Sequence, residues 1–278
     1  MAAQVELGDI TVDVLQESTF ALDGGAMFGV VPRVLWEKTD PPDEKNRVAL
    51  ACNVAVIRAH GAVILVDTGM GESWSEKERT IYRLSRSRPL SYRLAGLDVE
   101  AEEVDFVVNT HLHFDHAGGN TETHDGRTMP AFPRARYVVQ DGELSDARNA
   151  HERNRASYRA PDWEVVAEAG QLDAIAGERE IVPGVRVIPT GGHTTHHQMV
   201  RVDGGGQTLV IPSDLLPTSS HLPLPFIMGF DLHPVDTLEA KRRLLAEAEP
   251  GGWWMVFYHD ARTPLGRVRR EGERYALR

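Results

Sequence analysis

The sequence is short of cysteine, of basic residues relative to acidic ones, and of long apolar runs. Its 278 residues include one cysteine, Cys52, which excludes an intrachain disulfide and fits a reducing compartment. Lys and Arg together number 30 against 41 for Asp and Glu, a formal net charge of −11, so a broad basic face for nucleic acid or anionic lipid is not expected. No run approaches the roughly 18 apolar residues of a membrane span. The start lacks the basic and apolar regions of a secretory signal. These absences predict a cytoplasmic protein with no nucleic-acid or membrane partner.

Residues 110–119 are the most informative stretch of the chain, because three histidines and an aspartate fall within six positions there. The stretch follows the apolar run 104–109, which predicts that it leaves the end of a buried strand. Side chains two apart in an extended segment point the same way, so His111 and His113 can converge on one ion.

The second half of this stretch holds Asp115 and His116, followed by small residues at 117–119 where the chain must turn. Such a turn could aim this pair at a neighbouring ion. Imidazole nitrogens and carboxylate oxygens suit zinc and other divalent first-row metals. A histidine-rich surface loop is the alternative, but so many candidate ligands directly after an apolar strand favour a metal site.

Three later apolar segments, each predicted to be a strand, are also followed by a candidate ligand. They are 185–189 before His193, 208–212 before Asp214, and 253–258 before His259. Ligands at separate strand ends can meet at one edge of a sheet, which is where α/β folds tend to place chemistry.

Two more strands are predicted at 50–58 and 62–66, joined by a tight turn, and helices at 73–97 and 237–249. Asp67 follows the second of these strands in a glycine-rich turn. A lone aspartate at a turn usually caps backbone. Its place after an apolar strand suggests another role, which is to hold a metal ligand by a hydrogen bond.

Two apolar segments punctuated by proline, 20–42 and 217–234, either cover the core or wall a substrate pocket. The candidate pocket residues are Met27, Phe28, Leu222 and Phe226. The apolar parts at 26–36 and 222–228 could instead pair two copies of the chain, so a homodimer is the alternative.

The sequence leaves open the roles of His151, His196, His197 and His221. His151 lies in a polar stretch and is expected to face solvent. His196 and His197 lie close to His193, either touching the ligands or at the surface, and His221 belongs to the segment 217–234.

Taken in order, these motifs resemble those of the metallo-β-lactamase superfamily. The matching pieces are Asp67-Thr68-Gly69, the run 111–116, Gly192-His193-Thr194, Ser213-Asp214 and the late His259. The resemblance implies an α/β fold, a four-layer αββα sandwich with two sheets facing each other and helices outside. It also implies a site for two divalent metal ions at one sheet edge.

The resemblance also implies the ligand set, carried over position by position. One ion takes His111, His113 and His193, the other takes Asp115, His116 and His259, and Asp214 bridges them. Zinc is the expected metal, with manganese, iron and cobalt as alternatives because availability often decides occupancy. Since these ligands are spread from residue 111 to 259, one site would tie residues 1–278 into a single domain.

Within the superfamily, the segments 22–29 and 154–158 are similar to the lactonase and methyl parathion hydrolase branch. Some acyl-homoserine lactonases place a tyrosine three residues after the bridging aspartate to polarise the substrate carbonyl. This chain has Pro217 there, so another donor would be needed.

These observations predict a metal-dependent hydrolase acting on a small-molecule ester or lactone. Hydroxide generated between the two ions would attack the carbonyl, with Asp115 or Asp214 managing the proton. A phosphodiesterase or phosphotriesterase, or a glyoxalase II-like thioesterase, could use the same site. A metal-containing regulator that binds a ligand without catalysis is the less expected alternative.

Overall fold

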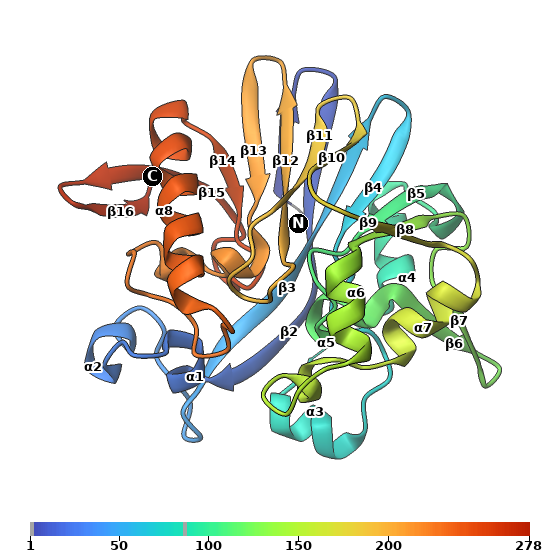
Figure 1. The fold of residues 1–278 in the computed structure, drawn as a ribbon, viewed down its shortest axis with the longest axis horizontal. Helices are drawn as coiled ribbons and strands as arrows, with labels where there is room; N and C mark the ends of the chain where they lie inside the picture. The colour runs from blue at the N-terminus through green and yellow to red at the C-terminus, as the bar shows by residue number, and fades with distance from the viewer. Residues whose placement is uncertain (1–2, 86–87) are drawn as a thin grey trace.

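The computed structural model describes residues 3–85 and 88–278, which form two facing β-sheets between outer layers of helices (Figure 1). The αββα sandwich expected from the sequence is therefore confirmed. None of the helices in these two ranges combines the length and apolar character needed to cross a membrane.

The first sheet has the order β1-β2-β3-β4-β5-β8-β9. Its strands are β1 (Ala3–Leu7), β2 (Ile10–Asp23), β3 (Arg47–Ala59), β4 (Ala62–Val66), β5 (Val104–Val108), β8 (Arg136–Gln140) and β9 (Leu172–Ile175). The pairs from β4 to β9 are parallel, and the pairs from β1 to β4 are antiparallel. Parallel strands need cover on both faces, which is why their sequences are almost continuously apolar.

The second sheet has the order β10-β11-β12-β13-β14-β15-β16. Its strands are β10 (Arg179–Val182), β11 (Val185–Pro189), β12 (Gln198–Gly204), β13 (Gln207–Ile211), β14 (Trp254–Val256), β15 (Leu265–Glu271) and β16 (Arg274–Leu277). Only the β13–β14 pair is parallel among the pairs of this sheet. A separate hairpin joins β6 (Thr121–His124) to β7 (Arg127–Pro130).

The main core lies between the two sheets, and the period of a strand explains how it forms. Ile57 of β3 and Leu209 of β13 point into the space between the sheets, where both are fully buried. Their neighbours Val56 and Val210 point to the opposite faces, because successive side chains alternate along a strand. Each sheet is therefore apolar on both faces and needs helices outside.

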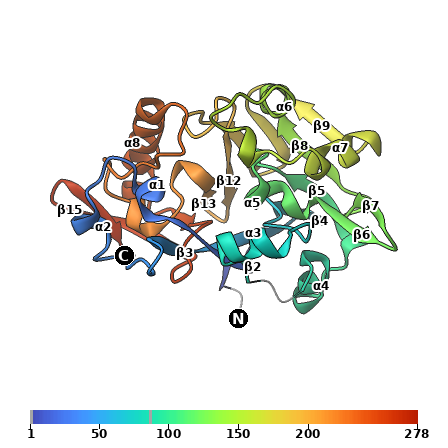
Figure 2. The same cartoon turned by 90° about the horizontal axis from the view of Figure 1, so that it is seen from below.

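Helices supply that outer cover on both sides (Figures 1 and 2). On the first sheet lie α4 (Leu90–Leu94), α6 (Asp141–Arg148) and α7 (Pro161–Glu168), and on the second lies α8 (Pro234–Gly251). The remaining helices, α1 (Gly24–Phe28), α2 (Arg33–Trp36), α3 (Glu76–Tyr82) and α5 (Phe114–Ala117), are short. They lie near the edge of the sheets that carries the predicted ligands (Figure 1).

The strand pair predicted at 50–58 and 62–66 is present as β3 and β4, and the helix predicted at 237–249 is present within α8. The single helix predicted at 73–97 is wrong. Helix α3 ends where Arg83 adopts a left-handed backbone conformation with φ of 48°. Helix α4 starts only after Pro89, and residues 86–87 of that prediction lie outside the described residues.

Candidate metal centre

The predicted ligands all leave strand ends at one edge of the sandwich. Strand β5 leads into His111 and His113, and α5 directly after it carries Asp115 and His116. The second sheet contributes from three places: His193 follows β11, Asp214 lies in the single turn η5 (Ser213–Leu215) after β13, and His259 follows β14. The two sheets therefore both supply side chains to one cluster, although the segments are far apart in the sequence.

Two glycines allow the first sheet to build its share of this cluster. A Cβ atom on Gly118 or Gly119 would lie 2.3 Å from a backbone carbonyl oxygen of the turn at 67–71. Because no side chain stands there, this turn packs directly on the end of α5. That close packing brings Asp67 beside His116.

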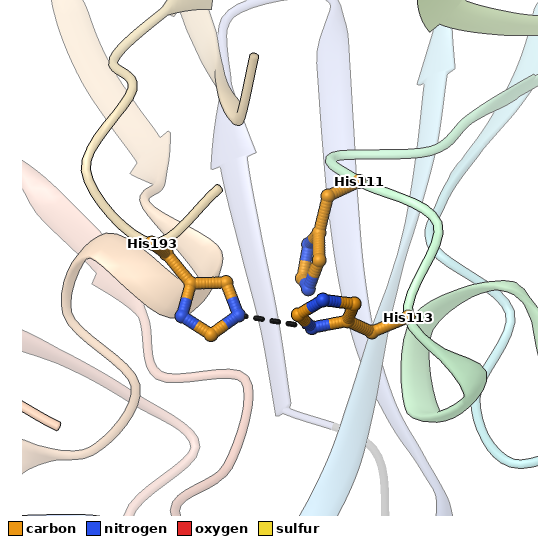
Figure 3. Close-up of side chains that lie close together, drawn as sticks. All are labelled: His111, His113 and His193. Carbon is orange, nitrogen blue, oxygen red and sulfur yellow. Dashed lines mark hydrogen bonds between the residues drawn. The ribbon is translucent and has the colours of Figure 1, made fainter. Parts of the chain in front are cut away.

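The first group of candidate ligands is His111, His113 and His193 (Figure 3). All three are buried, and one nitrogen of each lies within 4.8 Å of the others. His193 Nε2 lies 3.1 Å from His113 Nδ1. The sequence prediction that His111 and His113 converge is met by this geometry, and His193 closes the group from the other sheet.

The second group is Asp115, His116 and His259, again buried with one ligand atom of each within 4.8 Å of the others. The Nε2 atoms of the two histidines are 3.2 Å apart. His259 Nε2 also lies 3.7 Å from a carboxylate oxygen of Asp115.

Asp214 lies between the two groups and faces both. Its Oδ2 is 3.1 Å from His193 Nε2, whereas its Oδ1 is 3.0 Å from His259 Nε2 and 3.3 Å from His116 Nε2. A carboxylate with one oxygen toward each group has the arrangement needed to bridge two cations.

The chemistry of this donor set fits divalent metal ions. Two pairs of imidazole nitrogens face each other at about hydrogen-bond distance, and the buried Nε2 of His111 has no hydrogen-bond partner. Buried polar atoms normally have partners, so nitrogens gathered in this way need a shared cation or proton. The protein therefore has a His/Asp cluster able to bind metal.

Hydrogen bonds behind the rings fix which nitrogen faces the cluster. His116 Nδ1 lies 2.9 Å from Asp67 Oδ2, and His259 Nδ1 donates to the carbonyl oxygen of Ala51 at 2.8 Å. In each ring the Nδ1–H contact leaves the Nε2 lone pair pointing inward. Asp67 thus lies where the sequence placed it, in contact with a candidate ligand.

Sequence reasoning missed two carboxylates behind the cluster. Asp231 Oδ1 lies 2.9 Å from His193 Nδ1, and the fully buried Glu143 accepts hydrogen bonds from the Leu112 amide and the Thr194 hydroxyl. Asp231 follows no strand, and Glu143 lies inside α6, where a glutamate after β8 has the appearance of an ordinary helix residue.

Burial and neighbouring charges shift the pKa values of the clustered histidines in opposite directions. Burial and the neighbouring His116 hold the pKa of His111 well below its usual range. Burial also opposes the charged form of His116, but the carboxylates of Asp214 and Asp67 outweigh it and raise the pKa of His116 well above its usual value. Burial alone would raise the pKa of Asp214, yet the imidazoles of His116 and His259 lower it well below its usual value.

A cavity of about 310 Å³ opens onto the cluster. Its floor includes His113, Asp115, His193, Asp214 and His259. Its apolar lining residues include Leu22, Met27, Phe114, Met228 and Phe230, and its polar ones include Tyr82, Arg153, Asn154 and Ser157. Of the predicted pocket residues, Met27 lines this cavity.

The other predicted pocket residues lie elsewhere, and the prediction is corrected for them. Phe28 is buried between His221 and Trp36, with stacked rings whose centroids are 4.7 Å and 5.2 Å away. Leu222 is buried in the core under α8, and Phe226 borders a different surface cavity. An apolar composition does not distinguish a pocket wall from core, which is why these residues were misplaced.

The four histidines whose roles the sequence left open take separate places. His197 is buried behind His111, its Nδ1 lies 2.6 Å from the Thr190 hydroxyl, and burial lowers its pKa to about 3. His196 pairs with Asp146 at 3.1 Å nearer the surface.

His221 Nε2 lies 2.9 Å from the carbonyl oxygen of Met27, so this ring ties the segment at 219–221 to α1, away from the ligands. His151 is exposed and accepts a hydrogen bond from the Arg153 amide. Pro217 offers no donor, and its carbonyl accepts from the His259 amide at 2.8 Å.

Comparison with known proteins agrees with this geometry. Residues 47–259 match the family model of the metallo-beta-lactamase superfamily. An N-acyl homoserine lactonase from Bacillus sp is 29% identical over 218 residues, which cover 73% of this chain and 78% of that protein. A probable metal-dependent hydrolase from Staphylococcus aureus has a crystal structure with a TM-score of 0.91 and 28% identity, covering 99% of both chains. A dizinc quorum-quenching lactonase, solved with a product bound, shares the fold with a TM-score of 0.82 at 17% identity, covering 100% of this chain and 96% of that one.

Proposed function

Since the chain belongs to the metallo-β-lactamase superfamily and is a metallo-hydrolase, we propose that it binds two divalent metal ions, with zinc as the expected metal, and hydrolyses a small ester or lactone. The observation that carries this proposal is the position of Asp214, whose oxygens face two separate groups of buried histidines. The lactonases among the relatives support an ester-type substrate.

The proposed ligands are those that the geometry gathers. One ion would be held by His111, His113 and His193, the other by Asp115, His116 and His259, with Asp214 shared between them. Because both sheets contribute, we also propose that residues 1–278 act as a single domain.

Bound ions of this kind polarise a carbonyl and lower the pKa of water from ~15.7 toward ~7. The protein supplies the proton transfer. Asp115 and Asp214 both line the cavity, so their carboxylates lie beside the position that a substrate carbonyl would take. Water adds to the carbonyl carbon, and Asp115 accepts its proton, because its oxygens lie 3.7 Å and 4.0 Å from the ligand histidines whereas those of Asp214 approach them to 3.0 Å and 3.1 Å. The carbon–oxygen bond to the leaving alkoxide then breaks, and the alkoxide takes up that proton.

The cavity also limits the size of the substrate and offers groups that could orient it. A volume of about 310 Å³ is at the lower end for ligand pockets, which favours a small substrate. Tyr82, Asn154 and Ser157 line it with hydroxyl and amide donors, and we propose that one of them orients the carbonyl in place of the donor that Pro217 lacks.

The test is a substrate panel on metal-loaded protein with matched variants. His113→Ala and Asp214→Ala should lose turnover of lactones and p-nitrophenyl esters and contain less metal, whereas the exposed His151→Ala should match the wild type. Full activity in metal-poor variants would contradict the proposal. Preferred turnover of bis(p-nitrophenyl) phosphate or S-lactoylglutathione would favour a phosphodiesterase or a thioesterase. Stoichiometric metal with tight ligand binding and no turnover would favour a regulator.

The homodimer stays a prediction. Val30 and Val34 are 93% and 63% exposed, so the segment around α2 does offer an apolar surface. Leu222 is buried and adds nothing to such a surface. Sedimentation of the purified protein would decide this point.

A further inference from the structure

Among the residues that the structure describes, Arg153 is the one lysine or arginine that lines the cavity. Its other charged lining residues are Asp115 and Asp214, which belong to the proposed metal centre. A substrate held above that centre therefore meets a guanidinium group as well as apolar side chains.

Two backbone contacts hold Arg153 in place. Its Nη2 donates to the carbonyl oxygens of Gly229 and Asp231 at 2.8 Å and 3.2 Å. Gly229 also lines the cavity, and the Asp231 side chain contacts His193. The guanidinium is therefore fixed on the His193 side of the cavity, with its Nε and Nη1 donors unused by any described hydrogen bond.

The charge of Arg153 has no acidic partner among the residues that the structure describes. Arg47, Arg58 and Arg262 each pair with an aspartate within 3.0 Å. Asp231 contacts Arg153, but its carboxylate faces His193, and Arg153 donates only to its backbone oxygen. The chain has a net charge of −11. An unpaired guanidinium that lines the cavity therefore attracts negatively charged ligands to a protein that otherwise repels them.

We infer that Arg153 determines substrate specificity by binding a carboxylate at the end of the substrate remote from the scissile bond. This inference rests on the proposed ester hydrolysis and narrows its substrate class to small esters or lactones that carry a free carboxylate. A guanidinium with free donor positions and no acidic partner binds a carboxylate by a charge-assisted hydrogen bond, which is stronger than a hydrogen bond to a neutral carbonyl.

The test compares p-nitrophenyl hydrogen glutarate, which carries the carboxylate, with neutral p-nitrophenyl butyrate. The measured quantity is the ratio of kcat/KM for the anionic ester to that for the neutral one. In Arg153→Gln this ratio should fall roughly ten- to a hundredfold, mainly through KM, as expected for charge-assisted hydrogen bonds. Arg153→Lys should retain part of the preference. Arg155→Gln, an exposed neighbour outside the cavity lining, should keep the wild-type ratio.

The ratio separates substrate binding from a merely structural role. If Arg153 only holds the two chain segments together, Arg153→Gln lowers kcat/KM for both esters by the same factor. That result would overturn the inference. Equal turnover of both esters by the wild type would also overturn it while leaving the proposed hydrolysis intact.

If neither ester is turned over, the proposed function fails, and calorimetry decides the inference by itself. Metal-loaded wild type should then bind glutarate more tightly than butyrate, and Arg153→Gln should lose that difference. Equal binding of the two acids by the wild type would contradict the inference.

Discussion

Asp231 Oδ1 lies 2.9 Å from His193 Nδ1, so a residue just before α8 orients a ring that faces the candidate metal centre. The two chain segments are also joined by backbone hydrogen bonds, from the Leu232 amide to His193 and from the His233 amide to Gly192. The position of His193 therefore depends on the α8 side of the second sheet as well as on β11.

Asp231→Ala should weaken metal binding about 10- to 100-fold, because carboxylates behind ligand histidines fix the ring and its tautomer. Competition with a chromophoric zinc chelator measures this change. Asp236→Ala, at an exposed position in the first turn of α8, is the control and should bind metal as the wild type does. Unchanged affinity in Asp231→Ala would show that the contact does not support the ligand.

Metal removal should lower the melting temperature. The proposed ligands come from segments of both sheets that meet only in the folded state, so ions bind the folded protein selectively. At a free metal concentration of about 100 times Kd, such binding adds about 2.7 kcal/mol, which corresponds to several degrees for a chain of this size. Calorimetric scans with and without chelator, and after zinc is restored, measure the shift. Asp214→Asn should respond much less, and a wild type that melts identically in both conditions would refute stabilisation by metal.

Gly118→Ala should destabilise the protein and weaken metal binding together. The added Cβ would lie 2.3 Å from the Met70 carbonyl oxygen, so the turn at 67–71 must move away and take Asp67 from His116. Overpacking of this kind costs about 1–3 kcal/mol. Gly96→Ala is a matched control, since a Cβ there meets nothing within 4 Å. Chemical denaturation and zinc titration of both variants test the prediction, which fails if the two alanines behave alike.

His221 should make the stability of the wild type fall in acid. Burial lowers its pKa in the folded protein to about 3, whereas an unfolded chain has a histidine pKa of about 6.5. Between these values the unfolded state binds the extra proton, so stability is complete above about pH 6.5 and falls as the pH drops toward 3. By about pH 4.5 the loss reaches about 3 kcal/mol.

His221→Gln has no imidazole to protonate, so it should lose less stability than the wild type over the same pH range. Its stability at neutral pH should be lower than that of the wild type, because the stacking on Phe28 is lost. Urea denaturation at several pH values, with the exposed His151→Gln as control, gives the difference. Parallel pH profiles for wild type and His221→Gln would contradict the assignment.

The sequence predicted the parts of the centre that follow a local pattern. An apolar strand followed by a histidine or aspartate can be recognised along the chain, and His111, His193, Asp214 and His259 all follow such strands. The prediction of the fold rested on the order of these motifs and their resemblance to a known family, and the core between the two sheets confirms it.

Residues whose role depends on long-range packing could not be predicted in this way. Asp231 and Glu143 act through contacts made only after the second sheet and α6 have docked, and Arg153 lies on the cavity wall because its loop is tied to residues 229–231. Long-range packing also explains why the pocket prediction was wrong for Phe28 and Leu222. Their apolar character suited both a pocket and the core, and packing placed them in the core.

The most direct test of the account is a crystal structure of the metal-loaded protein with anomalous diffraction data collected on both sides of the zinc edge. A dinuclear centre should give two anomalous peaks, one among His111, His113 and His193 and one among Asp115, His116 and His259, with the Asp214 carboxylate between them. A fully loaded protein whose metal lies elsewhere, or that shows one peak at a single group of ligands, would contradict it.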